Sequence, residues 1–270
     1  MKLIKLLKNS SKSYIEQRPY LWNMTWNFVQ KSKLFLPHDP TYKALIYLKK
    51  NTEGLILDIG ANTGISALSF RKILPNYKII SFEPNVLLEA SLEKVERSDH
   101  FSYQMVGLGE SDGVFKLYTP IYKNIPLHTF SALSHEDVIK ALEITYKANI
   151  LKDIEVKSSD CKIRTLDSFN LDPDIIKVDA EGNELKIFLG AIQTIKKNKP
   201  SIIFEACHGD FEEIYKFLIN LNYQIFYFVS DQDRFINFSI ENRVKYNSGN
   251  RNLIAISRDS QSINSLPILY

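Results

Sequence analysis

The sequence predicts an α/β protein built on an open sheet, and a strand, a turn and a helix in succession carry that prediction. Leu55–Leu57 is a short apolar run of the kind that ends a buried strand. Gly60 and Gly64 then permit a tight turn. Residues 65–74 place apolar side chains on one side of a helix, which Pro75 ends. This order forms the ligand-binding edge of an open α/β sheet.

The glycine turn differs from the two common phosphate-binding loops. A dinucleotide fingerprint needs glycine two positions after Gly60, where Asn62 stands, and a P-loop needs lysine where Ile65 stands. Instead, Asp58 precedes the turn, and Glu83 ends the next predicted strand 25 residues later. An acid near this distance accepts hydrogen bonds from ribose hydroxyls. We expect S-adenosylmethionine, which carries an ammonium and a sulfonium. The alternative is that the glycines only make a turn and Glu83 only caps a helix.

Strands and helices alternate along most of the remaining chain. The predicted strands are 78–83, 101–108, 174–179, 200–205, 223–229 and 252–257, and the predicted helices are 41–50, 86–97, 185–197 and 211–221. We expect a polar loop over 230–251 and a disordered or loosely docked tail over 258–270.

Residues 113–166 interrupt this alternation. Strands are predicted at 114–118, 154–156 and 162–166, a loop at 119–135, and a helix at 136–149. Long insertions in compact domains are usually functional, so this region is expected to face the substrate. Its candidate substrate-binding residues, able to hydrogen-bond a polyhydroxylated ligand, are Tyr122, Thr129, Ser131 and His135. A plain surface excursion is the alternative.

Residues 1–53 form a predicted helical extension. Residues 1–50 hold ten Lys/Arg and two Asp/Glu, a net charge of +8, which leaves −5 for the rest of a chain of net charge +3. A basic, amphipathic start either packs on its own domain or contacts a membrane surface weakly. The aromatic residues of 20–35 are expected to cover the sheet or to form a lid.

Composition excludes several classes of protein. At 44% hydrophobic and 24% charged residues, the chain is globular and has no run of 18 apolar residues to cross a bilayer. Its start lacks the apolar core of a signal peptide. The only cysteines, Cys161 and Cys207, are expected to be free thiols, so a cytoplasmic protein is predicted. No basic run indicates a nucleic-acid partner. The oligomeric state stays open.

Further motifs follow the glycine turn and extend to the fifth predicted strand. They are Asp58-Ile-Gly-Ala-Asn-Thr-Gly64, Phe82-Glu-Pro-Asn85, Thr165-Leu-Asp167, Ile176-Lys-Val-Asp-Ala-Glu-Gly-Asn-Glu184, Leu189-Gly-Ala191 and Phe204-Glu205. Over residues 54–257 the chain resembles the FkbM-type S-adenosylmethionine-dependent methyltransferases. The resemblance implies a Rossmann-like class I fold, whose seven-stranded, mostly parallel sheet has an antiparallel last strand and helices on both faces.

The same resemblance implies O-methylation of a hydroxyl on a glycan, a polyketide or another secondary metabolite. Methylation of nitrogen and a cofactor-binding protein without turnover stay open. The expected cofactor-binding residues are Asp58, Gly60, Ala61, Asn62, Thr63, Gly64, Glu83, Pro84, Asn85, Gly107, Leu108 and Asp179.

A general base is expected where the fourth and fifth predicted strands end. Glu181 and His208 are the first candidates, followed by Asp179. In a further alternative, Asp179 and Glu205 share a magnesium ion, although no other ligand cluster accompanies them.

Overall fold

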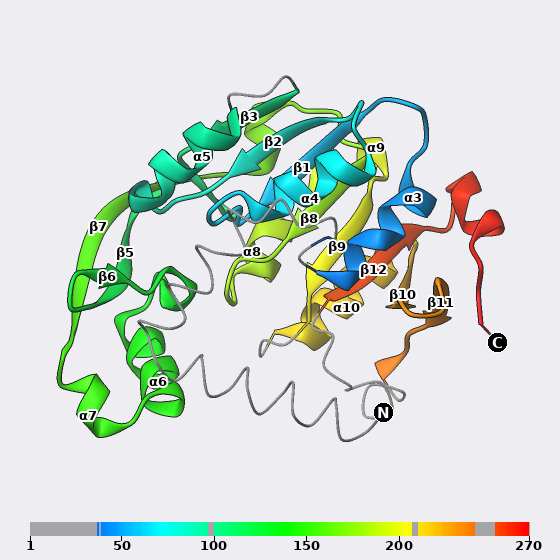
Figure 1. Cartoon of the computed structure of the whole chain (residues 1–270). Helices are drawn as coiled ribbons and strands as arrows, with labels where there is room; N and C mark the ends of the chain where they lie inside the picture. The colour runs from blue at the N-terminus through cyan, green and yellow to red at the C-terminus, as the bar shows by residue number, and fades with distance from the viewer. Residues whose placement is uncertain (1–36, 38, 97–99, 207–209, 241–251, 270) are drawn as a thin grey trace. The chain divides into compact units, whose positions relative to one another are not determined.

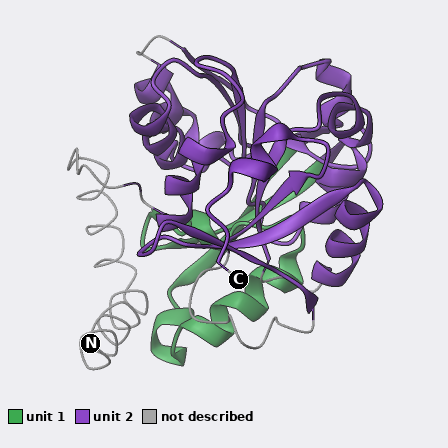
Figure 2. Ribbon diagram, turned by 90° about the vertical axis from the view of Figure 1, so that its right-hand side faces the viewer, with its two compact units in different colours: residues 1–35, 115–161 green, residues 36–114, 162–270 purple. Residues whose placement is uncertain are grey.

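The computed structural model describes residues 37, 39–96, 100–206, 210–240 and 252–269 (Figure 1). The expectations for a membrane-surface helix and for a cover or lid over 20–35 lie outside these residues. The described residues form two compact units (Figure 2). Those in 36–114 and 162–270 form the larger unit, and those in 115–161 form the smaller unit.

An eight-stranded sheet organises the larger unit (Figure 1). Its strands are β1 (Leu55–Ile59), β2 (Lys78–Phe82), β3 (Phe101–Gln104), β8 (Ile175–Val178), β9 (Ser201–Glu205), β10 (Tyr223–Val229), β11 (Arg234–Asn237) and β12 (Asn252–Ser257). Their order is β11-β10-β12-β9-β8-β1-β2-β3. The neighbouring strands β9, β8, β1, β2 and β3 run parallel to one another, whereas β12 is antiparallel to both β9 and β10. The predicted Rossmann-like sheet with an antiparallel last strand is confirmed.

The predicted count of seven strands is wrong by one, because β11 adds an antiparallel edge strand beside β10. This strand lies within 230–251, which the sequence predicted as a polar loop. Only one of its four residues, Phe235, is buried, so the segment lacks the apolar run of a central strand.

Helices pack on the main sheet in two apolar clusters, and successive residues of β1 contribute to different clusters. Ile56 belongs to one apolar cluster and Leu57 to the other, as the alternation of side chains along a strand requires. The first cluster takes residues from η1 (Pro40–Ala44), α3 (Leu45–Leu48), α4 (Ile65–Ile73) and α5 (Glu89–Glu96), and the second from α8 (Glu184–Leu189), α9 (Ile192–Asn198) and α10 (Phe211–Asn220). Short 3₁₀ turns lie at η2 (Val86–Leu88), η4 (Leu166–Phe169) and η6 (Gln261–Ser265).

Two predicted elements are each split in the structure. The helix predicted over 185–197 ends at Leu189 and restarts at Ile192. Between the two helices, Gly190 lies so near Gly109 that a Cβ on it would be 1.9 Å from the carbonyl oxygen of Gly109. The strand predicted over 101–108 ends at Gln104. Its last two residues form β4 (Gly107–Leu108), which pairs with a strand of a different sheet.

The end of the tail predicted over 258–270 docks on the edge strand β11 through residues 267–269. Leu266 is buried. Phe235 accepts a hydrogen bond from the backbone N–H of Leu269 at 2.8 Å and donates one to the carbonyl of Pro267 at 3.0 Å. The exposed edge of β11 therefore supplies the partners that order the tail.

The smaller unit contains most of a four-stranded sheet with the order β4-β7-β5-β6. Its elements are β5 (Gly113–Tyr122), β6 (Ile125–Pro126), η3 (His128–Phe130), α6 (His135–Thr145), α7 (Ala148–Leu151) and β7 (Ile154–Arg164). The loop predicted from residue 119 is wrong at its start, since β5 continues to Tyr122. The two strands predicted at 154–156 and 162–166 are one strand, and the predicted helix 136–149 breaks at the buried, extended Tyr146.

Candidate functional site

A turn of left-handed residues follows β1. Its φ angles are 72° at Gly60, 51° at Asn62 and 81° at Gly64, which directly precedes α4. A Cβ on Gly60 would lie 1.8 Å from the carbonyl oxygen of Asp179, so no other residue fits there without displacing the end of β8. The turn therefore packs closely against the backbone that follows β8.

The carboxylate of Asp58 lies beneath this turn and is fully buried. One of its oxygens accepts hydrogen bonds from the hydroxyls of Ser66 at 2.6 Å and Ser81 at 3.1 Å. Its other oxygen lies 3.3 Å from the side-chain nitrogen of Lys177. Asp58 is therefore surrounded by partners from α4, β2 and β8.

Lys177 is a buried cation that the sequence analysis did not select as a site residue. Its ammonium donates to the carbonyl oxygens of Ile59 at 3.1 Å and Gly60 at 2.7 Å. It also lies 3.7 Å from a carboxylate oxygen of Asp179. Burial lowers the pKa of Lys177, but the neighbouring acids Asp58 and Asp179 raise it more, so the side chain stays charged. A lysine within the apolar run of β8 is the signal that points to it.

Glu83 holds the turns after β1 and β2 together. Its carboxylate oxygens accept hydrogen bonds from the backbone N–H groups of Asn62 at 2.8 Å and Asn85 at 2.9 Å. Burial raises the pKa of Glu83 to about 7, against the opposing effects of those two N–H groups and of Lys177. Each oxygen keeps a second lone pair, so the carboxylate can still accept from a ligand.

Most of the predicted cofactor-binding residues come together at the carboxyl ends of β1, β2 and β8. The remaining two, Gly107 and Leu108, form β4. A Cβ on Gly107 would lie 3.2 Å from the Cβ of Pro84, which brings β4 beside the turn after β2. Thus residues from four segments, separated by up to 121 positions from Asp58 to Asp179, meet in the larger unit.

Asp179 and Glu205 form a carboxyl pair after β8 and at the end of β9. The Asp179 side chain is 36% exposed, whereas Glu205 is buried. Burial and the neighbouring Glu205 raise the pKa of Asp179, while Lys177 lowers it. A side-chain hydrogen bond with Glu205 is one of the interactions that raise the pKa of Asp179.

Tyr42 is a second residue near this pair that the sequence analysis missed. It is fully buried in η1, within the predicted extension 1–53. Burial raises the pKa of its phenol well above the usual value, followed by the charges of Asp39, Asp58, Asp179 and Glu205. The part of the extension from residue 39 onward therefore contributes to the core beneath the site.

The other candidate bases differ in their settings. Glu181 is exposed and has a left-handed φ of 50°. The loop that carries it is held by Glu184, whose buried carboxylate accepts from the N–H groups of Ala180 at 2.8 Å and Gly182 at 3.3 Å. His208 lies outside the described residues. Among the residues that are described, no group of three or more His, Cys, Asp or Glu side chains is arranged to hold a metal ion.

The four predicted substrate-binding residues all lie in the smaller unit. The hydroxyl oxygens of Ser131 and Thr119 are 3.0 Å apart, and the rings of His135 and Tyr118 meet edge to face with centroids 5.4 Å apart. The other two are Tyr122, which ends β5, and Thr129, which lies in η3. Burial also lowers the pKa of the neighbouring His128 to about 4, so that imidazole stays neutral near pH 7.

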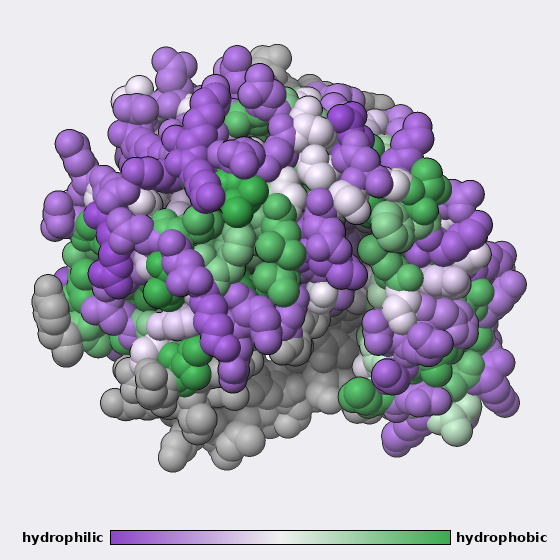
Figure 3. All heavy atoms as spheres, turned by 180° about the vertical axis from the view of Figure 1, so that it is seen from behind, coloured by the Kyte–Doolittle hydropathy of each residue, from purple (hydrophilic) through white to green (hydrophobic). Residues whose placement is uncertain are grey.

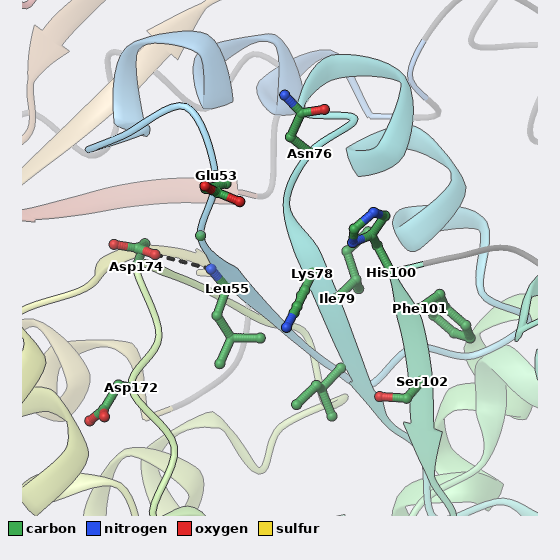
Figure 4. Close-up of a pocket in the computed structure, with 12 residues that line it drawn as sticks. Glu53, Leu55, Asn76, Lys78, Ile79, His100, Phe101, Ser102, Asp172 and Asp174 are labelled. Atoms are coloured by element: carbon green, nitrogen blue, oxygen red, sulfur yellow. Dashed lines mark hydrogen bonds between the residues drawn. The ribbon is translucent and has the colours of Figure 1, made fainter.

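A pocket of about 580 Å³ lies at the opposite, amino-terminal edge of the main sheet (Figure 4). It is lined by the first residues of three strands, Leu55, Lys78 and Phe101. Asp174 borders it and accepts a hydrogen bond from the N–H of Leu55 at 3.0 Å. None of the predicted site residues lines this pocket.

On the face drawn in Figure 3, hydrophobic side chains lie in separate groups among hydrophilic ones. No helix in the described part of the chain has the length and hydropathy to cross a bilayer.

The strand order and the antiparallel β12 define a class I methyltransferase fold, in which the conserved geometry places ligands at the carboxyl edge of the sheet. The family model described as the methyltransferase FkbM domain matches residues 58–225. The chain belongs to this family of S-adenosylmethionine-dependent methyltransferases, as its motifs predicted.

The chain is also similar to solved structures. The methyltransferase FkbM from Methylobacillus flagellatus KT is 16% identical, with a TM-score of 0.50, over 81% of this chain and 50% of that one. The chain thus spans about half the length of that protein. The SAH-bound methyltransferase PaMTH1 from Podospora anserina is 12% identical, with a TM-score of 0.38, over 93% of this chain and 94% of its own. No curated protein matches the sequence.

Proposed function

We propose that the protein transfers a methyl group from S-adenosylmethionine to a hydroxyl of a small molecule or glycan. Membership of the FkbM family supports the methyl transfer. The observation that carries the choice of cofactor is the joining of the turns after β1 and β2 by Glu83. Methylation of an amine and cofactor binding without turnover are the alternatives.

The donor set fits the proposed cofactor. Glu83 keeps lone pairs for ribose hydroxyls. The N-cap of α4 is Gly64, which has no side chain to cap the helix, and in this proposal the first N–H groups of α4 bind the carboxylate of the cofactor. Asp58 has protein partners on both oxygens and would shape the turn from below. When bound, S-adenosylmethionine supplies the electrophilic methyl group.

Asp179 is the general base in this proposal. A hydroxyl is a weak nucleophile near neutral pH, and a positioned base contributes about 10²–10⁴-fold. Asp179 is partly exposed after β8, and its raised pKa makes its carboxylate a stronger base than an ordinary aspartate. The alternatives are Glu181, which is exposed on the next loop, and His208.

The acceptor-binding residues are proposed to be Tyr122, Thr129, Ser131 and His135 in the smaller unit. Ser131 and Thr119 already form a hydroxyl pair, and such pairs recognise polyhydroxylated ligands by exchanging hydrogen bonds. Scrambling residues 119–135 should spare cofactor affinity and abolish transfer. Loss of cofactor affinity in a folded variant would show that these residues serve the cofactor instead.

Calorimetry with S-adenosylmethionine and S-adenosylhomocysteine tests the cofactor, with one site per chain expected. Glu83→Ala should weaken binding by about 1–3 kcal/mol, the usual cost of leaving a polar partner unsatisfied. Absence of binding by the wild type would overturn the proposal. Transfer of labelled methyl groups to a panel of hydroxylated and aminated compounds, with mass spectrometry of the products, then distinguishes O- from N-methylation.

The assignment of the base is tested by Asp179→Asn beside Glu181→Gln and His208→Asn. With saturating cofactor, Asp179→Asn should lose about two to four decades of the transfer rate while it keeps affinity for S-adenosylhomocysteine. If another variant shows that loss and Asp179→Asn does not, the base is the other residue.

A further inference from the structure

The buried ammonium of Lys177 contacts oxygens from two sides of the proposed site. On the cofactor side it donates to the carbonyls of Ile59 and Gly60 at 3.1 and 2.7 Å. On the side of the proposed base it lies 3.7 Å from a carboxylate oxygen of Asp179. Because Lys177 is itself buried, little solvent screens these interactions.

The charge of Lys177 is balanced by a carboxylate that has no exposed surface. Asp58 lies 3.3 Å away, and both side chains are buried. A buried ion pair of this kind is often no more stabilising than a well-packed apolar pair. Stability alone therefore does not account for a cation at this position, and its contacts to the glycine turn and Asp179 indicate a role in the site.

We propose that Lys177 is a positioning residue, whose ammonium holds the carbonyls of the glycine turn in place and keeps Asp179 in the charged form needed to accept a proton. The inference rests on the proposed function for its catalytic consequence. The physical part of it, the effect on the charge of Asp179, is measurable without any substrate.

The groups that act on Asp179 come from three strands. Glu205 on β9 and Asp58 on β1 are acidic and favour a proton on Asp179, whereas Lys177 on β8 is the cation among them. Burial and the charges of nearby acids, these among them, raise the pKa of the Tyr42 phenol in η1, so that it stays neutral. Without the ammonium, the acidic neighbours would keep Asp179 protonated to higher pH. A protonated acid is unable to accept the proton of a hydroxyl.

Infrared spectroscopy measures this charge directly, because a protonated carboxyl and a carboxylate absorb in separate bands. The band that Asp179→Asn removes from the wild-type spectrum is assigned to Asp179. The decisive comparison is Asp58→Asn against Asp58→Asn with Lys177→Met, since the double variant leaves no unpaired buried charge. The band should disappear at a pH about 1–3 units higher in the double variant, the size of effect that a neighbouring cation has on a carboxyl.

Two further variants separate the role of Lys177 from a general effect on structure. Lys197→Met removes an exposed lysine of the same unit, which pairs with Asp172, and should leave the titration of Asp179 unchanged. Lys177→Arg keeps the charge but changes its shape. In this variant Asp179 should titrate near its wild-type pH. The variant should bind S-adenosylhomocysteine about tenfold more weakly, a loss equivalent to one misplaced hydrogen bond.

Equal midpoints in Asp58→Asn and the double variant would overturn the effect on Asp179, and wild-type affinity in Lys177→Arg would overturn the effect on the turn. If the double variant does not fold, Lys177→Gln in the Asp58→Asn background serves for the same comparison. Failure of the wild type to bind S-adenosylhomocysteine would instead refute the proposed function, and the infrared titration would still report on Lys177.

Discussion

The side-chain nitrogen of Lys177 lies 2.7 Å from the carbonyl oxygen of Gly60, which precedes it by 117 residues in the chain. This hydrogen bond joins the end of β8 to the turn after β1. The two strands are neighbours in register, with Lys177 opposite Asp58. One buried cation thus connects a cofactor-binding turn with the strand that leads to the proposed base.

The first prediction concerns the buried pair of Asp58 and Lys177. Asp58→Ala leaves a buried ammonium without its main counter-charge, which should lower the free energy of unfolding by about 3–5 kcal/mol. Asp58→Ala combined with Lys177→Met should lose less than Asp58→Ala alone, because neither charge is left unpaired. Urea unfolding measures both. The exposed pair of Asp172 and Lys197 is the control, and its removal should change the stability little, because solvent screens the pair.

The second prediction concerns pH and Glu83. The folded protein binds the Glu83 proton up to a pKa of about 7, compared with 4.5 for an unperturbed glutamate. The unfolded chain therefore releases this proton first, and stability should fall as pH rises through that window, by about 3 kcal/mol in total. Urea unfolding across this range should show the fall in the wild type and not in Glu83→Gln. An identical pH dependence in the two proteins would contradict the prediction.

The third prediction concerns His128, whose effect on the pH dependence of stability is opposite to that of Glu83. Burial lowers the pKa of His128 to about 4, from the usual 6.5. Between these values only the unfolded chain takes up the proton, so stability should fall as pH decreases from 6.5 toward 4. Replacing His128 by Gln should reduce this loss, as measured by unfolding of the wild type and the variant at several pH values. His100, which is exposed, serves as the control position.

The fourth prediction concerns the loop between β8 and α8. Glu184→Ala removes the acceptor for the N–H groups of Ala180 and Gly182, which should then exchange with solvent hydrogen faster. Stability should fall by about 1–3 kcal/mol. Asp167→Ala is the matched control, because this carboxylate accepts from the backbone and hydroxyl of Thr194 at 2.8 and 2.7 Å, away from the loop. If both variants leave the loop amides equally protected, Glu184 does not hold the loop.

The fifth prediction concerns the acceptor. Once an acceptor has been found in the methyl-transfer assay, Ser131→Ala should raise its KM about tenfold, as expected for the loss of one good hydrogen bond. Affinity for S-adenosylhomocysteine should not change. Ser134→Ala is the control, because Ser134 caps α6 through Asp137 N–H at 3.2 Å and its loss should affect stability alone. Equal KM values in the wild type and Ser131→Ala would remove Ser131 from the acceptor site.

Much of the fold was predictable because its signals are local. The apolar runs of β10 and β12 gave strand bounds that agree with the structure, and the glycine turn and Glu83 marked the edge where ligands bind in such sheets. The order of these signals along the chain, together with the motifs, was enough to identify the family. Hydrophobic period and backbone freedom are properties of short segments, so a sequence reports them directly.

The features that escaped prediction depend on contacts between distant segments. β11 is a strand because β10 offers it an edge, and position 190 needs a glycine because it lies against Gly109. The partners of the Asp58 carboxylate, Ser66, Ser81 and Lys177, were likewise not predictable from the sequence. Which partner a buried charge finds is decided by the packing of strands, because that packing sets both the distance between charges and their separation from water.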